Sequence, residues 1–169
     1  MPDPRRLVLP LAIALATLLP GPARAADQGW SWPVVGPVIR GFEPPLGPYG
    51  PGHRGIDIAV SFGTPVHAPA PGLVLFAGKV GGERFVTIDH GGGLVSTYSW
   101  LSSLAVRKGD VVIEGAVLAL TGEGHPGAAV PNLHFGAKRD GVYVDPLTLL
   151  SRMSVAGLIH LAPLPPGGG

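Results

Sequence analysis

The stretch Gly52-His53-Arg54-Gly55-Ile56-Asp57-Ile58-Ala59 decides how the rest of this chain is interpreted. From Ile56 onward its residues alternate in polarity, which is typical of a β-strand that carries Asp57 on the face opposite its isoleucines. The segment Asn132-Leu133-His134-Phe135 alternates in the same way, with its histidine and asparagine on one face. Two segments separated by about eighty residues therefore each place a potential ligand on the polar face of a strand.

Two imidazoles and one carboxylate, from His53, Asp57 and His134, match the three-ligand set with an open fourth position found in hydrolytic zinc sites. In one continuous strand His53 and Asp57 would lie about 13 Å apart at ~3.3 Å per residue, too far to share an ion. We therefore expect a bend between them. Gly52 and Gly55 permit one, because glycine enters backbone regions closed to other residues. These residues predict a metal site.

The chain of 169 residues contains 27 glycines and 20 prolines, a content that raises the question of disorder. Its hydrophobic fraction is nevertheless 46%, and the glycines and prolines fall between short apolar runs, where they mark turns. We expect an all-β fold with long glycine-rich loops. The expected elements are a strand near 38–42, a buried strand over 72–78, a hairpin of 84–90 and 94–100 joined by three glycines, short strands within 109–115 and 116–121, a closing strand at 143–145, and a short helix over 146–153.

Residues 1–25 have the pattern of a secretory signal peptide, with Arg5 and Arg6 before an apolar run and Ala23-Arg24-Ala25 as cleavage site. The alternative is a membrane anchor, but the run from Leu7 to Leu19 is shorter than the ~20 residues that span a bilayer. We expect export from a bacterium to the medium or the cell wall, with no membrane attachment after cleavage. The predicted mature chain divides into an N-terminal arm (26–51), a β domain (52–153) and a flexible tail (154–169).

Charge and cysteine content exclude several classes of function. Of 12 basic and 11 acidic side chains, nine and ten remain after the signal is removed. A nearly neutral chain without a basic patch does not indicate nucleic-acid binding. The chain has no cysteine, so a metal must be held by histidine and carboxylate.

The order of motifs along the chain resembles that of the lysostaphin-type (LytM-like) zinc metallo-endopeptidases, which cut peptidoglycan cross-links. The shared motifs, which cover roughly residues 52–150, are Gly-His-x-Gly-Ile-Asp, Gly-Thr-Pro-Val-x-Ala, Thr-Tyr-x-x-Leu, Gly-Asp-x-Val-x-x-Gly, Leu-His-Phe and Val-Asp-Pro. The resemblance implies a small antiparallel β-sheet core with a groove, zinc held by His53, Asp57 and His134, and peptidoglycan or wall peptides as partner. We expect a monomer.

Two positions depart from the pattern of the active enzymes. The third motif there is His-x-His, and a further catalytic histidine follows the strand tyrosine by two positions; this chain has Asn132 and Trp100 instead. Neither an amide nor an indole transfers protons near neutral pH. Weak catalytic candidates remain in Tyr98, which could donate to an oxyanion, and in His125 and Glu123 of the loop before the third motif. No catalytic role is expected for His67, His90 or His160.

Three functions compete on this basis. The first is a zinc endopeptidase with weak activity, and the second is an inactive, zinc-containing module that binds the wall or regulates another protein. The third is a biotinyl or lipoyl carrier domain, because these share strands of the Gly-Asp-x-Val-x-x-Gly type. A carrier needs a modifiable lysine at a hairpin tip, and Lys79 lacks the expected flanking residues.

Overall fold

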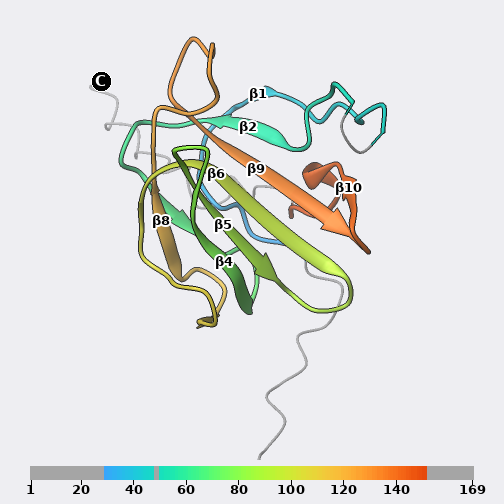
Figure 1. The fold of residues 1–169 in the computed structure, drawn as a ribbon, viewed down its shortest axis with the longest axis vertical. Helices are drawn as coiled ribbons and strands as arrows, with labels where there is room; N and C mark the ends of the chain where they lie inside the picture. The colour runs from blue at the N-terminus through green and yellow to red at the C-terminus, as the bar shows by residue number, and fades with distance from the viewer. Residues whose placement is uncertain (1–28, 48–49, 152–169) are drawn as a thin grey trace, which may run out of the picture.

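The strand β9 (Asn132–Arg139) lies inside the sheet, between β2 and β6, in the computed structural model, which describes residues 29–47 and 50–151 (Figure 1). The strand order is β1-β2-β9-β6-β5-β4-β7, with β10 added beside β9, and β8 joining β6 to β3. All pairings between these strands are antiparallel. The other elements are β1 (Val38–Arg40), β2 (Ile56–Ala59), β3 (Pro65–His67), β4 (Gly72–Val80), β5 (Glu83–Asp89), β6 (Leu94–Leu104), β7 (Val111–Val112), β8 (Val117–Thr121), β10 (Val142–Val144) and the 3₁₀ turn η1 (Pro146–Thr148).

This architecture confirms the predicted all-β class. The hairpin of β5 and β6 is joined by Gly91, Gly92 and Gly93, and all three have positive φ angles, which glycine adopts at little cost. The predicted strands near 38–42, 109–115, 116–121 and 143–145 correspond to β1, β7, β8 and β10. No helix in the described part of the chain is both long and apolar enough to cross a membrane.

Two expectations about elements were wrong. β4 is not a buried strand: Val74 is buried, but Leu73 and Leu75 are about 40% exposed, because β4 lies near the margin of the sheet, covered only by the two-residue strand β7. The predicted C-terminal helix is only a 3₁₀ turn within the described residues. After this turn, Leu149 accepts a hydrogen bond from the backbone of Trp30, and Ser151 donates one back to it, which holds the chain in an extended bridge.

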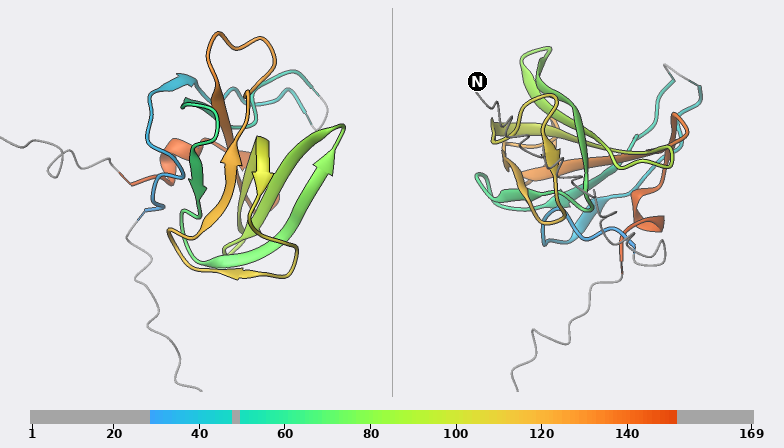
Figure 2. Two further views of the ribbon diagram at one scale, coloured as in Figure 1. Left: turned by 90° about the vertical axis from the view of Figure 1, so that its left-hand side faces the viewer. Right: turned by 90° about the horizontal axis from the view of Figure 1, so that it is seen from below.

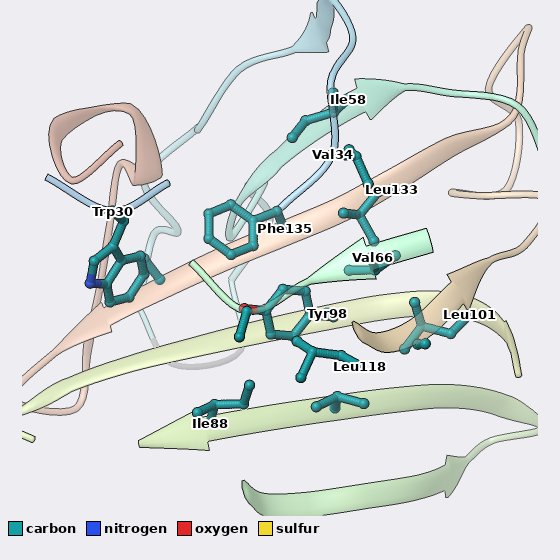
Figure 3. Close-up of a cluster of buried hydrophobic side chains, with 14 of the residues drawn as sticks. Trp30, Val34, Ile58, Val66, Ile88, Tyr98, Leu101, Leu118, Leu133 and Phe135 are labelled. Atoms are coloured by element: carbon teal, nitrogen blue, oxygen red, sulfur yellow. The ribbon is translucent and has the colours of Figure 1, made fainter. Parts of the chain in front are cut away.

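The core fills one face of the sheet and is closed by β3 and β8 (Figure 3). Phe135 contacts two aromatic rings there, Tyr98 at 5.4 Å and Trp30 at 6.2 Å between ring centroids. Trp30 and Val34 are buried, so the segment predicted as an N-terminal arm supplies part of the core. The predicted signal peptide and tail lie outside the described residues.

Candidate metal centre

The backbone bends between His53 and β2, as the spacing of the two ligands required. His53 forms an isolated antiparallel bridge with Glu43, with N–H to carbonyl distances of 2.9 and 3.0 Å, and β2 begins only at Ile56. Gly52 has a φ angle of +152°, and a Cβ there would lie 2.8 Å from the carbonyl oxygen of Glu43. The bend brings the imidazole of His53 beside Asp57 instead of four residues away along a strand.

Asp57 and His134 meet across the sheet, because they are direct partners in the antiparallel pairing of β2 with β9. The Nδ1 atom of His134 lies 2.8 Å from Oδ1 of Asp57, and Nε2 of His53 lies 3.0 Å from each of these two atoms. His53 and Asp57 are nearly inaccessible, whereas His134 is partly exposed. Three ligand atoms therefore converge at one point at the edge of the core.

Hydrogen bonding orients the first of these ligands. Nδ1 of His53 lies 2.7 Å from the carbonyl oxygen of Gly41, and since a carbonyl can only accept, this nitrogen carries the proton. The lone pair of neutral His53 is then on Nε2 and faces a carboxylate oxygen at 3.0 Å. Two acceptors this close require a proton or a cation between them. Buried imidazoles oriented by a second hydrogen bond are also typical of metal ligands, so the residues fit a zinc ion.

Electrostatics favour the anionic form of Asp57. Burial alone would raise the pKa of this carboxyl, but the hydrogen bond from His134 and the nearby His134, His53 and His125 together hold the pKa below its ordinary value of 3.8. Asp57 is thus a carboxylate at neutral pH, which is the form that ligates a metal.

Gly55 allows the two ligand strands to approach. A Cβ at this position would lie 2.4 Å from the carbonyl oxygen of Phe135 and 2.9 Å from Nε2 of His134. No larger residue fits without moving β9, so this glycine is a packing requirement of the site as well as part of the bend.

A groove extends from His53 and His134 over the face of the sheet opposite the core. Its lining includes aromatic and aliphatic side chains, namely Phe76, Val80, Phe85 and Trp100, and three residues with hydroxyl groups, Thr87, Thr97 and Ser99. Arg54, Lys138 and Tyr143 line the other end. The groove is therefore open to an extended peptide that passes the ligands.

Trp100 enters this groove because of an irregularity in β6. Its φ angle of 63° is left-handed, and the pairing of β6 with β5 shifts register at this point. Regular alternation would direct Trp100 to the same face as the buried Tyr98, whereas a bulge of this kind re-aims a side chain. The indole thereby lines the groove beside the ligands.

Asn132 is fully buried and its amide is engaged with the loop that precedes β9, drawn in orange at the top of Figure 1 and of the left view of Figure 2. Its Oδ1 accepts from the backbone N–H of His125 at 3.1 Å, and its Nδ2 donates to the carbonyl of Val130 at 3.0 Å. The side chain at this position therefore holds the loop in shape, in addition to being unable to transfer a proton.

The three weak catalytic candidates are placed very differently. Tyr98 is fully buried in the core, where it accepts from Ser96, and burial raises its pKa, so it cannot reach an oxyanion in the groove (Figure 3). Glu123 is exposed and faces a separate hollow that includes Arg84. Only His125 adjoins the ligands, with ring centroids 5.9 Å from His53 and 6.1 Å from His134.

Two residues that line the groove, Lys138 and Tyr143, were not predicted as site residues from the sequence. Lys138 follows His134 by four positions on β9, so the same alternation that placed His134 on the polar face also predicts Lys138 there. Tyr143 is the direct partner of Lys138 on β10, but nothing in the sequence alone indicates that pairing.

The antiparallel fold, the cluster of two histidines and one aspartate and the adjoining groove define a metallopeptidase-like domain. Residues 51–146 match the model of Peptidase family M23, and the chain belongs to this family, whose peptidases depend on zinc. This match confirms the family that the motifs resembled.

Comparison with known proteins supports the assignment. Over 147 residues the chain is 37% identical to an uncharacterized protein of Mycobacterium tuberculosis, covering 83% of this chain and 59% of the relative. It is 34% identical to the murein hydrolase activator NlpD of Salmonella typhimurium, covering 75% and 32% of the two chains. The structure of the antimicrobial peptidase lysostaphin from Staphylococcus simulans aligns with a TM-score of 0.64 at 27% identity, covering 85% and 63%. The chain thus spans less than two thirds of the length of each of these two relatives.

Proposed function

We propose that this protein is an exported M23 domain that holds one zinc ion through His53, Asp57 and His134 and hydrolyses peptide cross-links of peptidoglycan slowly. One observation carries the proposal: three ligand atoms converge within 3.0 Å of one another beside an open groove. A zinc ion bound there would polarise a peptide carbonyl and acidify a water molecule.

The residues of this chain account for slow turnover. Asn132 and Trp100 stand where the resembling enzymes have proton-transferring histidines, and a positioned acid or base typically contributes 10²- to 10⁴-fold to a rate. Trp100 also fills part of the groove next to the ligands. His125 is the one candidate beside the ligands that could contact a reacting group, and it supports the remaining activity in this proposal.

The experiment is release of dye from labelled peptidoglycan by the purified, zinc-loaded protein. We expect release that is slow but above that of His134→Ala, with His67→Ala as a matched histidine control that keeps the wild-type rate. Wild-type release equal to that of His134→Ala would contradict the enzymatic proposal.

The relative named as a murein hydrolase activator favours a second candidate, in which the domain regulates a separate wall hydrolase. In that case the protein alone would release no dye but would accelerate release by an added, purified wall hydrolase. His134→Ala would then test whether the regulatory role needs the metal. The wall-related relatives and the leader pattern both support a location in the cell envelope or outside the cell.

A further inference from the structure

The groove has a cationic end at a fixed distance from the ligands. His134, Gly136 and Lys138 alternate along β9, so they share the face that lines the groove. Four residues at ~3.3 Å each separate His134 from Lys138, which places the lysine backbone about 13 Å from the ligand. Gly136 lies between them and has no side chain to obstruct the groove. A Cβ at this position would lie 2.5 Å from the hydroxyl oxygen of Thr97.

Two cations are held at this end by one aromatic ring. The amine of Lys138 lies 4.5 Å from the ring centroid of Tyr143, and the guanidinium of Arg54 lies 6.0 Å from the same centroid. Arg54 also donates to the carbonyl of Gly50 at 3.0 Å. Cation–π contacts restrict both side chains without neutralising their charge. The cationic end is therefore preorganised before any ligand arrives.

The groove offers Lys138 no internal counter-charge. None of its described lining residues is acidic. Among residues 29–47 and 50–151, no carboxylate forms an ion pair with Lys138. Asp57 is turned toward the two histidines. A nearly neutral protein thus presents a locally positive groove.

We infer that the groove selects a peptide that carries a carboxylate about three residues from the residue over the metal ligands. Lys138 binds this carboxylate, and Tyr143 and Arg54 position Lys138. This inference names the substrate class of the proposed site and rests on the proposed function. Extended peptides advance about 3.3 Å per residue, so three residues cover about 10 Å of the distance from His134 to Lys138. The side chains of Lys138 and of the peptide's acidic residue cover the remainder. Phe76 and Phe85 line the apolar side of the same groove.

The test measures binding, so it does not depend on turnover. The probes are capped hexapeptides of glycine and alanine with one glutamate moved through the six positions, each paired with its glutamine counterpart. We expect the glutamate peptide to bind about tenfold more tightly than its glutamine counterpart at one or two adjacent positions, as a hydrogen bond to a charged group allows. This preference should fall as salt rises from 50 mM, because the lysine is partly exposed.

Two lysine variants make the test specific. Lys138→Met keeps the aliphatic stem and should abolish the preference for glutamate, whereas Lys108→Met makes the same charge change at an exposed residue away from the groove and should retain it. Equal binding of glutamate and glutamine peptides by the wild type, or no binding of any peptide at millimolar concentration, would overturn the inference. A preference that survives in Lys138→Met but disappears when zinc is removed would also overturn it, since the carboxylate would then bind the metal. Zinc content and dye release, measured on the same samples, report separately on the proposed function.

Discussion

Gly55→Ala is the substitution whose effect follows most directly from the geometry of the site. The added Cβ would lie 2.4 Å from the carbonyl oxygen of Phe135 and 2.8 Å from its carbon, distances that real Cβ atoms do not adopt. Both are backbone atoms of β9, so relief requires moving this strand away from β2 by more than half an ångström. Overpacking of this kind typically costs about 1–3 kcal/mol. At about 2–4 °C per kcal/mol for a chain of this length, the melting temperature should fall by roughly 2–12 °C.

The same displacement should weaken metal binding, because the new Cβ would also lie 2.9 Å from Nε2 of His134. The assay is thermal unfolding with and without zinc, together with a competitive zinc titration. Gly41→Ala is the matched control: Gly41 also adjoins the site, through its carbonyl bond to His53, but a Cβ there meets nothing within 4 Å. A Gly55→Ala protein with wild-type melting temperature and zinc affinity would refute the strand geometry on which the site is built.

Three further predictions concern catalysis, pH and export. Asn132→His combined with Trp100→His should raise the rate of dye release by at least ~10²-fold. Loss of the Asn132 hydrogen bonds should at the same time lower the free energy of unfolding by about 1–3 kcal/mol. An unchanged rate in a folded double variant would contradict the explanation of slow turnover. Burial lowers the pKa of His90 below its ordinary 6.5, so the folded state favours the neutral imidazole, and this contribution to stability should be present above pH 6.5 and lost as pH falls below it. Urea unfolding of zinc-free protein gives the free energy of unfolding at pH 7.5 and at pH 5.5. The difference between these two free energies should be smaller in His90→Gln than in His67→Gln, and equal differences would count against the role of His90. Mass spectrometry of exported protein should find a mature N-terminus at Ala26 or within a few residues, and recovery of chains that retain Met1 would reject signal cleavage.

The alternation of apolar and polar residues carried most of the predictive value of the sequence. It placed Asp57 and His134 on polar strand faces, and the pairing of β2 with β9 makes them direct partners. The rise per residue of a strand separately required a bend between His53 and Asp57, and the bridge of His53 to Glu43 lies at that bend. The strand faces and the bend are local consequences of residue type, so they could be predicted without the structure, whereas the pairing of β2 with β9 could not.

Other features depend on contacts between distant segments and could not be predicted. The chain turns back to pair Leu149 and Ser151 with Trp30, which ends the expected helix after one turn. The bulge that directs Trp100 into the groove arises from the register of β6 against β5. Tyr98 was a catalytic candidate by its motif, yet it is buried against Phe135, its pairing partner on β9. In these cases the spacing of residues in the sequence determines neither the register between strands nor the distant segment with which a residue pairs.

In the proposed function, His53, Asp57 and His134 hold a zinc ion through specified atoms. Anomalous diffraction at the zinc edge, on crystals of the mature protein grown with zinc, tests it directly. We expect one strong peak at about 2.0–2.2 Å from Nε2 of His53, Nδ1 of His134 and a carboxylate oxygen of Asp57. Absence of a peak at these atoms, or a peak that remains at full occupancy in His134→Ala, would contradict it.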